Sequence, residues 1–240
     1  FYYKQTSIFL YHTTYAIDST KAQILIFGAP TGNTHYNPGA FGEKLKMSVY
    51  NTGRDGNSIF YHYSVLQSVL KRYSPKIAIL DFNMGEFRFD KRSYDRLSSL
   101  LPYYEDHPEI RPVIDLKGTF EKYKLLSKIY PFNSQIFTIA VGNTSFNKKR
   151  NNIIDENGYV PLSQIWTGGM TYNYSKPTYK LDSNKIYFFK SFITDCLSHG
   201  IRLYIVNSPR LIKYAYSDTS ISIAKEIAKQ ARIPFYEFST

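Results

Sequence analysis

The chain has 240 residues, which is enough for one α/β domain with a continuous core, and its net charge of +11 favours acidic partners such as an anionic glycan. No apolar run reaches the roughly 18 residues that a membrane-spanning helix needs, and the single cysteine, Cys196, excludes an internal disulfide framework and a cysteine-rich zinc site. The basic residues are scattered apart from Lys148, Lys149 and Arg150, and no helix-turn-helix or ribonucleoprotein motif accompanies them, so we expect no nucleic-acid partner.

The order of apolar and amphipathic segments predicts the fold class. Residues 1–20 lack a signal-peptide pattern, and we expect them to form an N-terminal stem. Apolar runs bounded by turn residues predict strands at 23–28, 47–51, 76–82, 201–207 and 233–238, and helical spacing predicts helices at 58–73, 182–199 and 218–231. This alternation predicts an α/β fold, a three-layer α/β/α sandwich with a five-stranded parallel sheet in the flavodoxin-like order 2-1-3-4-5.

Residues 88–180 interrupt this alternation. They contain helical stretches at 91–104, 108–116, 120–129 and 133–141, followed by a polar loop at 143–179 that is rich in Gly, Asn and Tyr and holds the only tryptophan, Trp166. We interpret the region as a helical and loop insertion after the third strand, within a single domain that spans residues 1–240. Insertions at the carboxyl ends of parallel strands often form the wall or lid of a site.

Three glycine-containing turns follow the first three predicted strands. They read "GAPTGNTHY" from Gly28, "NTGRDGNS" from Asn51 and "DFNMGEF" from Asp81. A doubly wound sheet brings the carboxyl ends of these strands together. The sequence therefore predicts one cleft that all three turns line.

In their order and spacing, these turns resemble those of the SGNH or GDSL hydrolases, in particular envelope-associated bacterial members whose second block is similar to "VYNTGRDGNSIFYHYSVLQSVLKRYSPKIAILD". The resemblance covers residues 20–85 well and 180–240 loosely. It implies an ester hydrolase or O-acyl transferase that acts on an acylated glycan or a small ester, in the cell envelope or another extracytoplasmic compartment. It also implies that Gly53 and Asn83 donate hydrogen bonds in an oxyanion hole.

Two departures from the family pattern affect catalysis. The nucleophile position falls on Pro30, which has neither a hydroxyl group nor a backbone N–H, and no Asp-x-x-His pair follows the last strand. We therefore expect a catalytically incomplete chain, which is either a pseudoenzyme that retains the cleft for binding a glycan or an acylated partner, or a chain that is trimmed at its carboxyl end and altered at its serine. Thr31 and His35 remain candidate cleft residues, and His62 and Asp81 are weaker candidates.

Two alternatives stay open at this point. The residues Thr31, Gly32, Asn33 and Thr34 are similar to the flavodoxin loop that holds the phosphate of flavin mononucleotide. The Tyr-rich insertion is also compatible with a non-catalytic module that binds a glycan or polyanion. The preferred interpretation requires no cofactor, and we expect no metal site because no His-x-x-x-His, Asp-rich calcium loop or Cys/His cluster is present.

Overall fold

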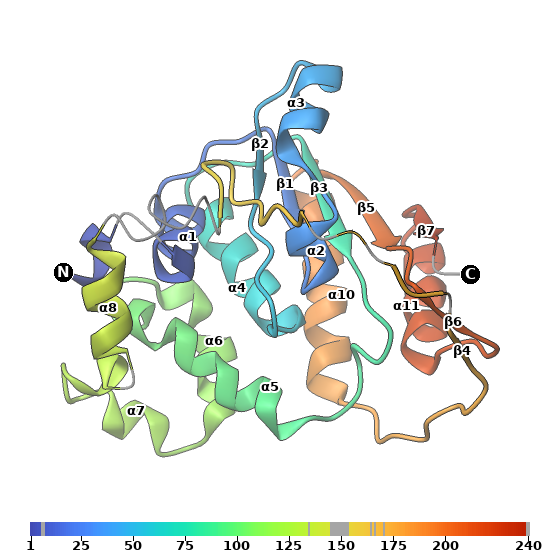
Figure 1. Cartoon of the computed structure of the whole chain (residues 1–240). Helices are drawn as coiled ribbons and strands as arrows, with labels where there is room; N and C mark the ends of the chain where they lie inside the picture. The colour runs from blue at the N-terminus through green and yellow to red at the C-terminus, as the bar shows by residue number, and fades with distance from the viewer. Residues whose placement is uncertain are drawn as a thin grey trace.

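The computed structural model describes residues 1–5, 8–133, 135–144, 154–163, 165, 167–169 and 171–238; the basic residues 148–150 and Trp166 lie outside the described residues. At its centre is a five-stranded, all-parallel sheet that helices flank (Figure 1). Its strands are β1 (Ile24–Phe27), β2 (Val49–Asn51), β3 (Ile77–Asp81), β5 (Arg202–Asn207) and β7 (Phe235–Glu237). Each lies within a range that the apolar runs predict.

The strand order is β2-β1-β3-β5-β7, which differs in numbering from the expected 2-1-3-4-5. The difference arises because two further strands, β4 (Thr171–Asn173) and β6 (Ile212–Tyr214), pair in parallel with each other and form a separate two-stranded sheet. Each has only three residues, so neither produces a run long enough to predict a strand from the sequence. In the central sheet, the register places Phe27 beside Leu80 and Leu80 beside Ile205.

Helices lie between these strands along the chain. They are α2 (Thr31–Thr34), α3 (Pro38–Leu45), α4 (Ile59–Leu70), α10 (Ser183–Ser198) and α11 (Thr219–Gln230). The carboxylate of Asp182 accepts hydrogen bonds from backbone amides in the first turn of α10, and the carboxylate of Asp218 does the same for α11. Within the described residues, no helix is long and apolar enough to cross a membrane.

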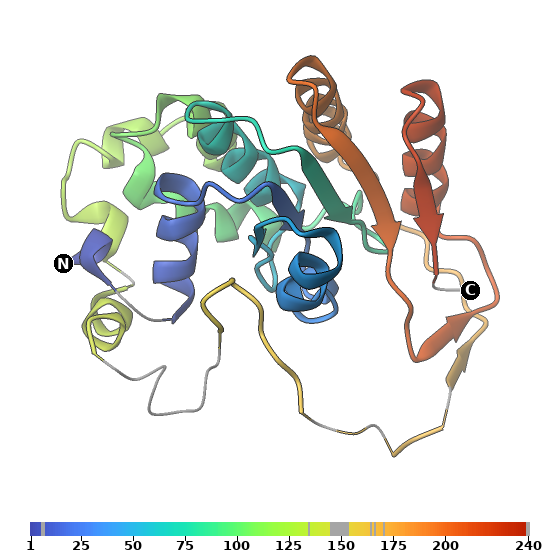
Figure 2. The same ribbon diagram turned by 90° about the horizontal axis from the view of Figure 1, so that it is seen from above.

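The two faces of the sheet are covered unequally. On one face Leu25, Phe27 and Leu80 belong to a large core cluster that also takes in residues of α4, α10 and α11. Figure 2 shows α10 and α11 on one side of the sheet and α2 and α3 on the other. The cluster on the second face is small and centres on β1 and β2, whereas Tyr236 of β7 is exposed there. Helical cover on that face is thus concentrated at the β1 and β2 end.

The amino-terminal residues differ from the expected stem. They form a 3₁₀ helix, η1 (Tyr2–Lys4), and the helix α1 (Ile8–Asp18), which packs against α4. Leu10, Ala16 and Ile17 of α1 are buried in the main core. Burial of these apolar side chains along one side of α1 is what stabilises so short a helix.

The insertion is helical but more fragmented than the sequence indicates. Prolines contribute to this fragmentation, because each lacks the N–H that would continue a helical ladder. Figure 1 shows the resulting short helices beside α1 and α4. They are α5 (Lys91–Asp95), η2 (Arg96–Tyr103), η3 (Pro108–Ile110), α6 (Arg111–Ile114), η4 (Asp115–Lys117), α7 (Glu121–Lys124), η5 (Tyr130–Phe132) and α8 (Ile136–Gly142). Ile110, Val113 and Ile114 join the main core, so this part of the insertion is integral to the fold.

Two buried histidines are expected to make the fold sensitive to acid. Burial lowers the pKa of His12 to about 4 and the pKa of His62 to about 3, because a charged imidazole would lose its hydration. Between the ordinary value of 6.5 and these lowered values, the unfolded chain binds protons that the folded chain does not. Stability therefore falls as the pH decreases through this window, by about 1.4 kcal/mol per pH unit for each histidine.

Urea unfolding measured at several pH values between neutrality and mild acid tests this expectation. His62→Phe should reduce the dependence of the unfolding free energy on pH by about 1.4 kcal/mol per unit, because phenylalanine does not titrate. Within the described residues, the Nδ1 atom of His62 has no hydrogen-bond partner to lose. An unchanged pH dependence in this variant would show that His62 is not kept neutral by burial.

Candidate ligand-binding site

The first three turns converge at the carboxyl edge of the sheet, and glycine makes their close approach possible. Gly28 has a φ angle of +147°, and a Cβ atom added there would lie 2.7 Å from the Cβ atom of Asp81. A Cβ atom on Gly53 would lie 2.9 Å from both the Gly28 oxygen and the Asn33 nitrogen. These separations are too short for any side chain, so the three turns can pack together only with glycine at both positions.

The carboxylate of Asp81 is the centre of a hydroxyl network. Asp81 is only 3% exposed. Its Oδ1 atom accepts hydrogen bonds from Tyr36 OH at 3.0 Å and from Ser208 Oγ at 2.5 Å, and its Oδ2 atom accepts one from the Thr31 hydroxyl. These donors come from the segments after β1 and β5, whereas Asp81 ends β3. These hydrogen bonds therefore join the ends of three parallel strands into one rigid surface. We call this surface the floor of the site.

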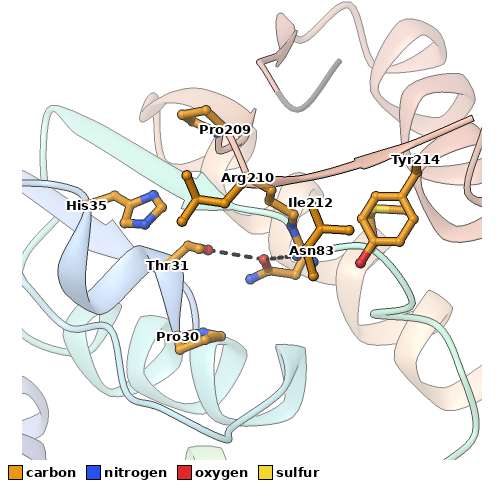
Figure 3. Close-up of a pocket in the computed structure, with 10 residues that line it drawn as sticks. Pro30, Thr31, His35, Asn83, Pro209, Arg210, Ile212 and Tyr214 are labelled. Atoms are coloured by element: carbon orange, nitrogen blue, oxygen red, sulfur yellow. Dashed lines mark hydrogen bonds between the residues drawn. The ribbon is translucent and has the colours of Figure 1, made fainter. Parts of the chain in front are cut away.

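Asn83 and Arg210 form a second polar pair above this floor. The Oδ1 atom of Asn83 accepts hydrogen bonds from Thr31 Oγ1 at 3.0 Å and from Arg210 Nη2 at 2.5 Å (Figure 3). Its Nδ2 group donates to the backbone oxygen of Ala29. The Nε atom of Arg210 is buried, and within the described part of the chain it has no hydrogen-bond partner. Arg210 thus carries one buried N–H group that no described residue satisfies.

These polar groups lie at a pocket of about 570 Å³, a size that suits a small organic ligand. Figure 3 shows the side chains that surround it. Most of its wall is apolar, and Ile212 and Tyr214 of β6 close one side. The residues that line the pocket are Pro30, Thr31, His35, Asn83, Met84, Pro209, Arg210, Leu211, Ile212 and Tyr214. The separate two-stranded sheet therefore has a clear role, since it supplies an apolar wall opposite Thr31 and His35.

The structure brings three of the residues singled out in the sequence to this pocket, namely Thr31, His35 and Asn83. Gly53 does not line it, and its backbone amide donates to Asn51 Oδ1 at 2.8 Å. His62 is buried within α4 and also lies outside the lining set. Of the two oxyanion-hole residues that the resemblance implies, Asn83 therefore lies beside the pocket. The backbone amide of Gly53 is already paired within the protein.

The flavodoxin-like loop is arranged differently from a phosphate cradle. Gly32 and Asn33 are buried rather than open to the pocket, and the Thr34 hydroxyl donates to the Pro30 oxygen at 3.3 Å. The hydroxyl of Thr31 donates to the carboxylate of Asp81, whose negative charge would repel a phosphate. Among the described residues, no group of three His, Cys, Asp or Glu side chains could hold a metal ion.

Sequence reasoning missed Tyr36, Ser208 and Arg210. Ser208 directly follows β5, at the same edge of the sheet as the predicted turns, so the rule that carboxyl ends gather there could have found it. Arg210 follows two residues later, and its role depends on a contact across 127 positions of sequence. No local pattern indicates that contact.

The fold and the site define an α/β protein with a pocket at the carboxyl edge of a parallel sheet. In comparisons with protein-family models, with curated proteins and with solved structures, no family, relative or structure matches the chain.

Proposed function

We propose that this chain is a binding protein of the SGNH-hydrolase type, which holds the acyl group of an O-acylated glycan in the Arg210 pocket without cleaving the ester. The observation that carries the proposal is the guanidinium group of Arg210, whose Nε atom has no described partner, in the lining of a pocket whose walls are otherwise mostly apolar. An acyl group matches this combination, because its carbonyl oxygen accepts a hydrogen bond while its alkyl part contacts apolar side chains. The same proposal includes a three-layer sandwich, with α3 in the third layer, and a location in the cell envelope.

Among the described residues that line the pocket, no hydroxyl group is paired with a histidine base, which supports binding rather than hydrolysis. Pro30 lines the pocket at the position where the family resemblance places the attacking serine. Thr31 is the nearest hydroxyl in the sequence, but its hydroxyl group donates to Asp81 and to Asn83, and no described histidine accepts its proton. Without a base, a threonine hydroxyl is a weak nucleophile at neutral pH.

Binding of flavin mononucleotide is the less favoured alternative. It would need free hydroxyl groups and backbone amides around a phosphate, whereas Thr31 and Thr34 are engaged with acceptors of the protein itself. A colourless protein that leaves the fluorescence of added flavin mononucleotide unchanged is the expected result.

Isothermal titration calorimetry with O-acetylated N-acetylglucosamine tests the proposal. We expect saturable binding that is at least about tenfold tighter than binding of N-acetylglucosamine that carries no O-acetyl group, since the apolar walls and Arg210 would lose their partner. Acetate release should stay at the buffer rate. Equal affinity for the two sugars, no binding of either, or acetate release above the buffer rate would each overturn the proposal.

Introducing the missing hydroxyl group is expected to leave the protein inactive. Pro30→Ser in this chain would restore a nucleophile beside the pocket, but His35 is the only histidine in the lining set, and no described carboxylate hydrogen-bonds to it. A serine without an oriented base gains little reactivity. Turnover of p-nitrophenyl acetate should therefore match that of the unmodified chain, and a clear increase would show that His35 acts as the base.

A further inference from the structure

A second, smaller cavity adjoins the Arg210 pocket. It has a volume of about 160 Å³, and Pro30 and Met84 line both spaces. The two residues thus form a ridge between them. Unlike the Arg210 pocket, the small cavity is bordered largely by polar side chains, among them Ser58, Glu86, Arg88, Asp90, Ser93 and Lys185.

The charges around the small cavity are balanced. Glu86 and Asp90 contribute carboxyl groups, and Arg88 and Lys185 contribute basic groups. Burial raises the pKa of Glu86, and its Oε1 atom accepts a hydrogen bond from the backbone amide of Ile59 at 2.8 Å. This balance does not favour an anion or a cation, so the cavity is suited to a neutral polar group.

Ser58 leaves a polar side chain available to such a group. It occupies the N-cap position of α4, but its side chain makes no capping hydrogen bond. The residue is only 8% exposed and lines the small cavity. A buried hydroxyl group normally has a hydrogen-bond partner. Because the Ser58 hydroxyl makes no capping bond, a ligand in the small cavity can supply that partner.

We propose that the small cavity is a sugar subsite, which takes hydroxyl groups of the sugar ring while the Arg210 pocket takes the acyl group attached to that ring. This inference rests on the proposed function and adds the orientation of the ligand. Sugar hydroxyl groups both donate and accept, as the mixed lining of the small cavity requires. The ester linkage then crosses the ridge of Pro30 and Met84, so the bond that the family would cleave lies over a residue with no attacking group.

The affinity of Ser58→Ala for two probes tests this orientation. We expect about a fivefold loss for O-acetylated N-acetylglucosamine, which is the effect of removing one hydrogen bond. Butyrate offers an acyl chain and no sugar ring, so its affinity should not change. Ser198→Ala removes an exposed hydroxyl at the far end of α10 and serves as the matched control. Arg88→Ala provides a second variant of the small cavity if Ser58→Ala does not fold.

The outcomes separate the inference from the proposed function. If the unmodified chain does not bind the acetylated sugar, the proposed function fails. If it binds and the Ser58→Ala and Arg88→Ala variants bind equally well, the sugar subsite is wrong while the proposed function stands. If these variants lose affinity for butyrate to the same extent as for the sugar, they act through the protein structure, and the subsite is again wrong.

Discussion

Arg210→Ala is expected to weaken the binding of O-acetylated N-acetylglucosamine by at least about tenfold. Hydrogen bonds from charged groups contribute about 1.5–3 kcal/mol, and tenfold in affinity corresponds to about 1.4 kcal/mol. The guanidinium group has two roles, since Nη2 holds Asn83 at 2.5 Å and the buried Nε atom has no described partner of its own. Titration calorimetry of the variant and the unmodified chain measures the difference.

Lys213→Ala is the matched control for this experiment. Lys213 lies between Ile212 and Tyr214 on β6, but it does not line the pocket. Its removal subtracts the same charge from the protein and should leave the affinity nearly unchanged. Equal losses in both variants would mean that net charge attracts the ligand, and the specific role of Arg210 would then be wrong. Arg210→Lys should recover only part of the affinity, because an ammonium group cannot replace the planar guanidinium.

Asp81→Ala is expected to lower the free energy of unfolding by about 3 kcal/mol. The carboxylate is buried and accepts hydrogen bonds from Thr31, Tyr36 and Ser208. The substitution removes three hydrogen bonds, and at about 1 kcal/mol each they account for the expected loss. Denaturation in urea, monitored by circular dichroism, provides the measurement.

Ser208→Ala tests one hydrogen bond of this network separately from the carboxylate at its centre. It removes one donor and leaves Asp81 with Thr31 and Tyr36, so we expect a loss of about 1 kcal/mol. If Asp81→Ala were as stable as the unmodified chain, the buried carboxylate would make no net contribution to the free energy of unfolding. It would then not be the group that joins the strand ends. That result would contradict the description of the floor of the site.

The central sheet was predictable because each of its strands leaves a local signal. An apolar run such as residues 24–27 is buried at every position, and Asp182 and Asp218 cap helices that begin with the next residue. The two-stranded sheet and the fragmented insertion were not predictable in this way. Three-residue strands leave no period to detect, and helices of one turn depend on tertiary packing rather than on intrinsic propensity.

The candidate site was only partly predictable for a related reason. Thr31, His35 and Asn83 could be found because they follow strands whose carboxyl ends must gather at one edge. Arg210 and Tyr36 acquire their importance from contacts that join distant parts of the sequence. The pairing of the Gly53 amide with a neighbouring side chain also depends on the exact course of the turn. A family resemblance predicts such a position but not the direction of its N–H group.

Saturation-transfer nuclear magnetic resonance on the unmodified chain with O-acetylated N-acetylglucosamine tests the central claim most directly, because it reports ligand contact and ester integrity in one sample. We expect the strongest transfer at the O-acetyl methyl group, as burial of that group against Leu211 and Ile212 requires, with no free acetate accumulating above the buffer control. Transfer confined to the sugar ring, no transfer at all, or steady growth of the acetate signal would contradict a pocket that holds an acyl group and leaves it intact.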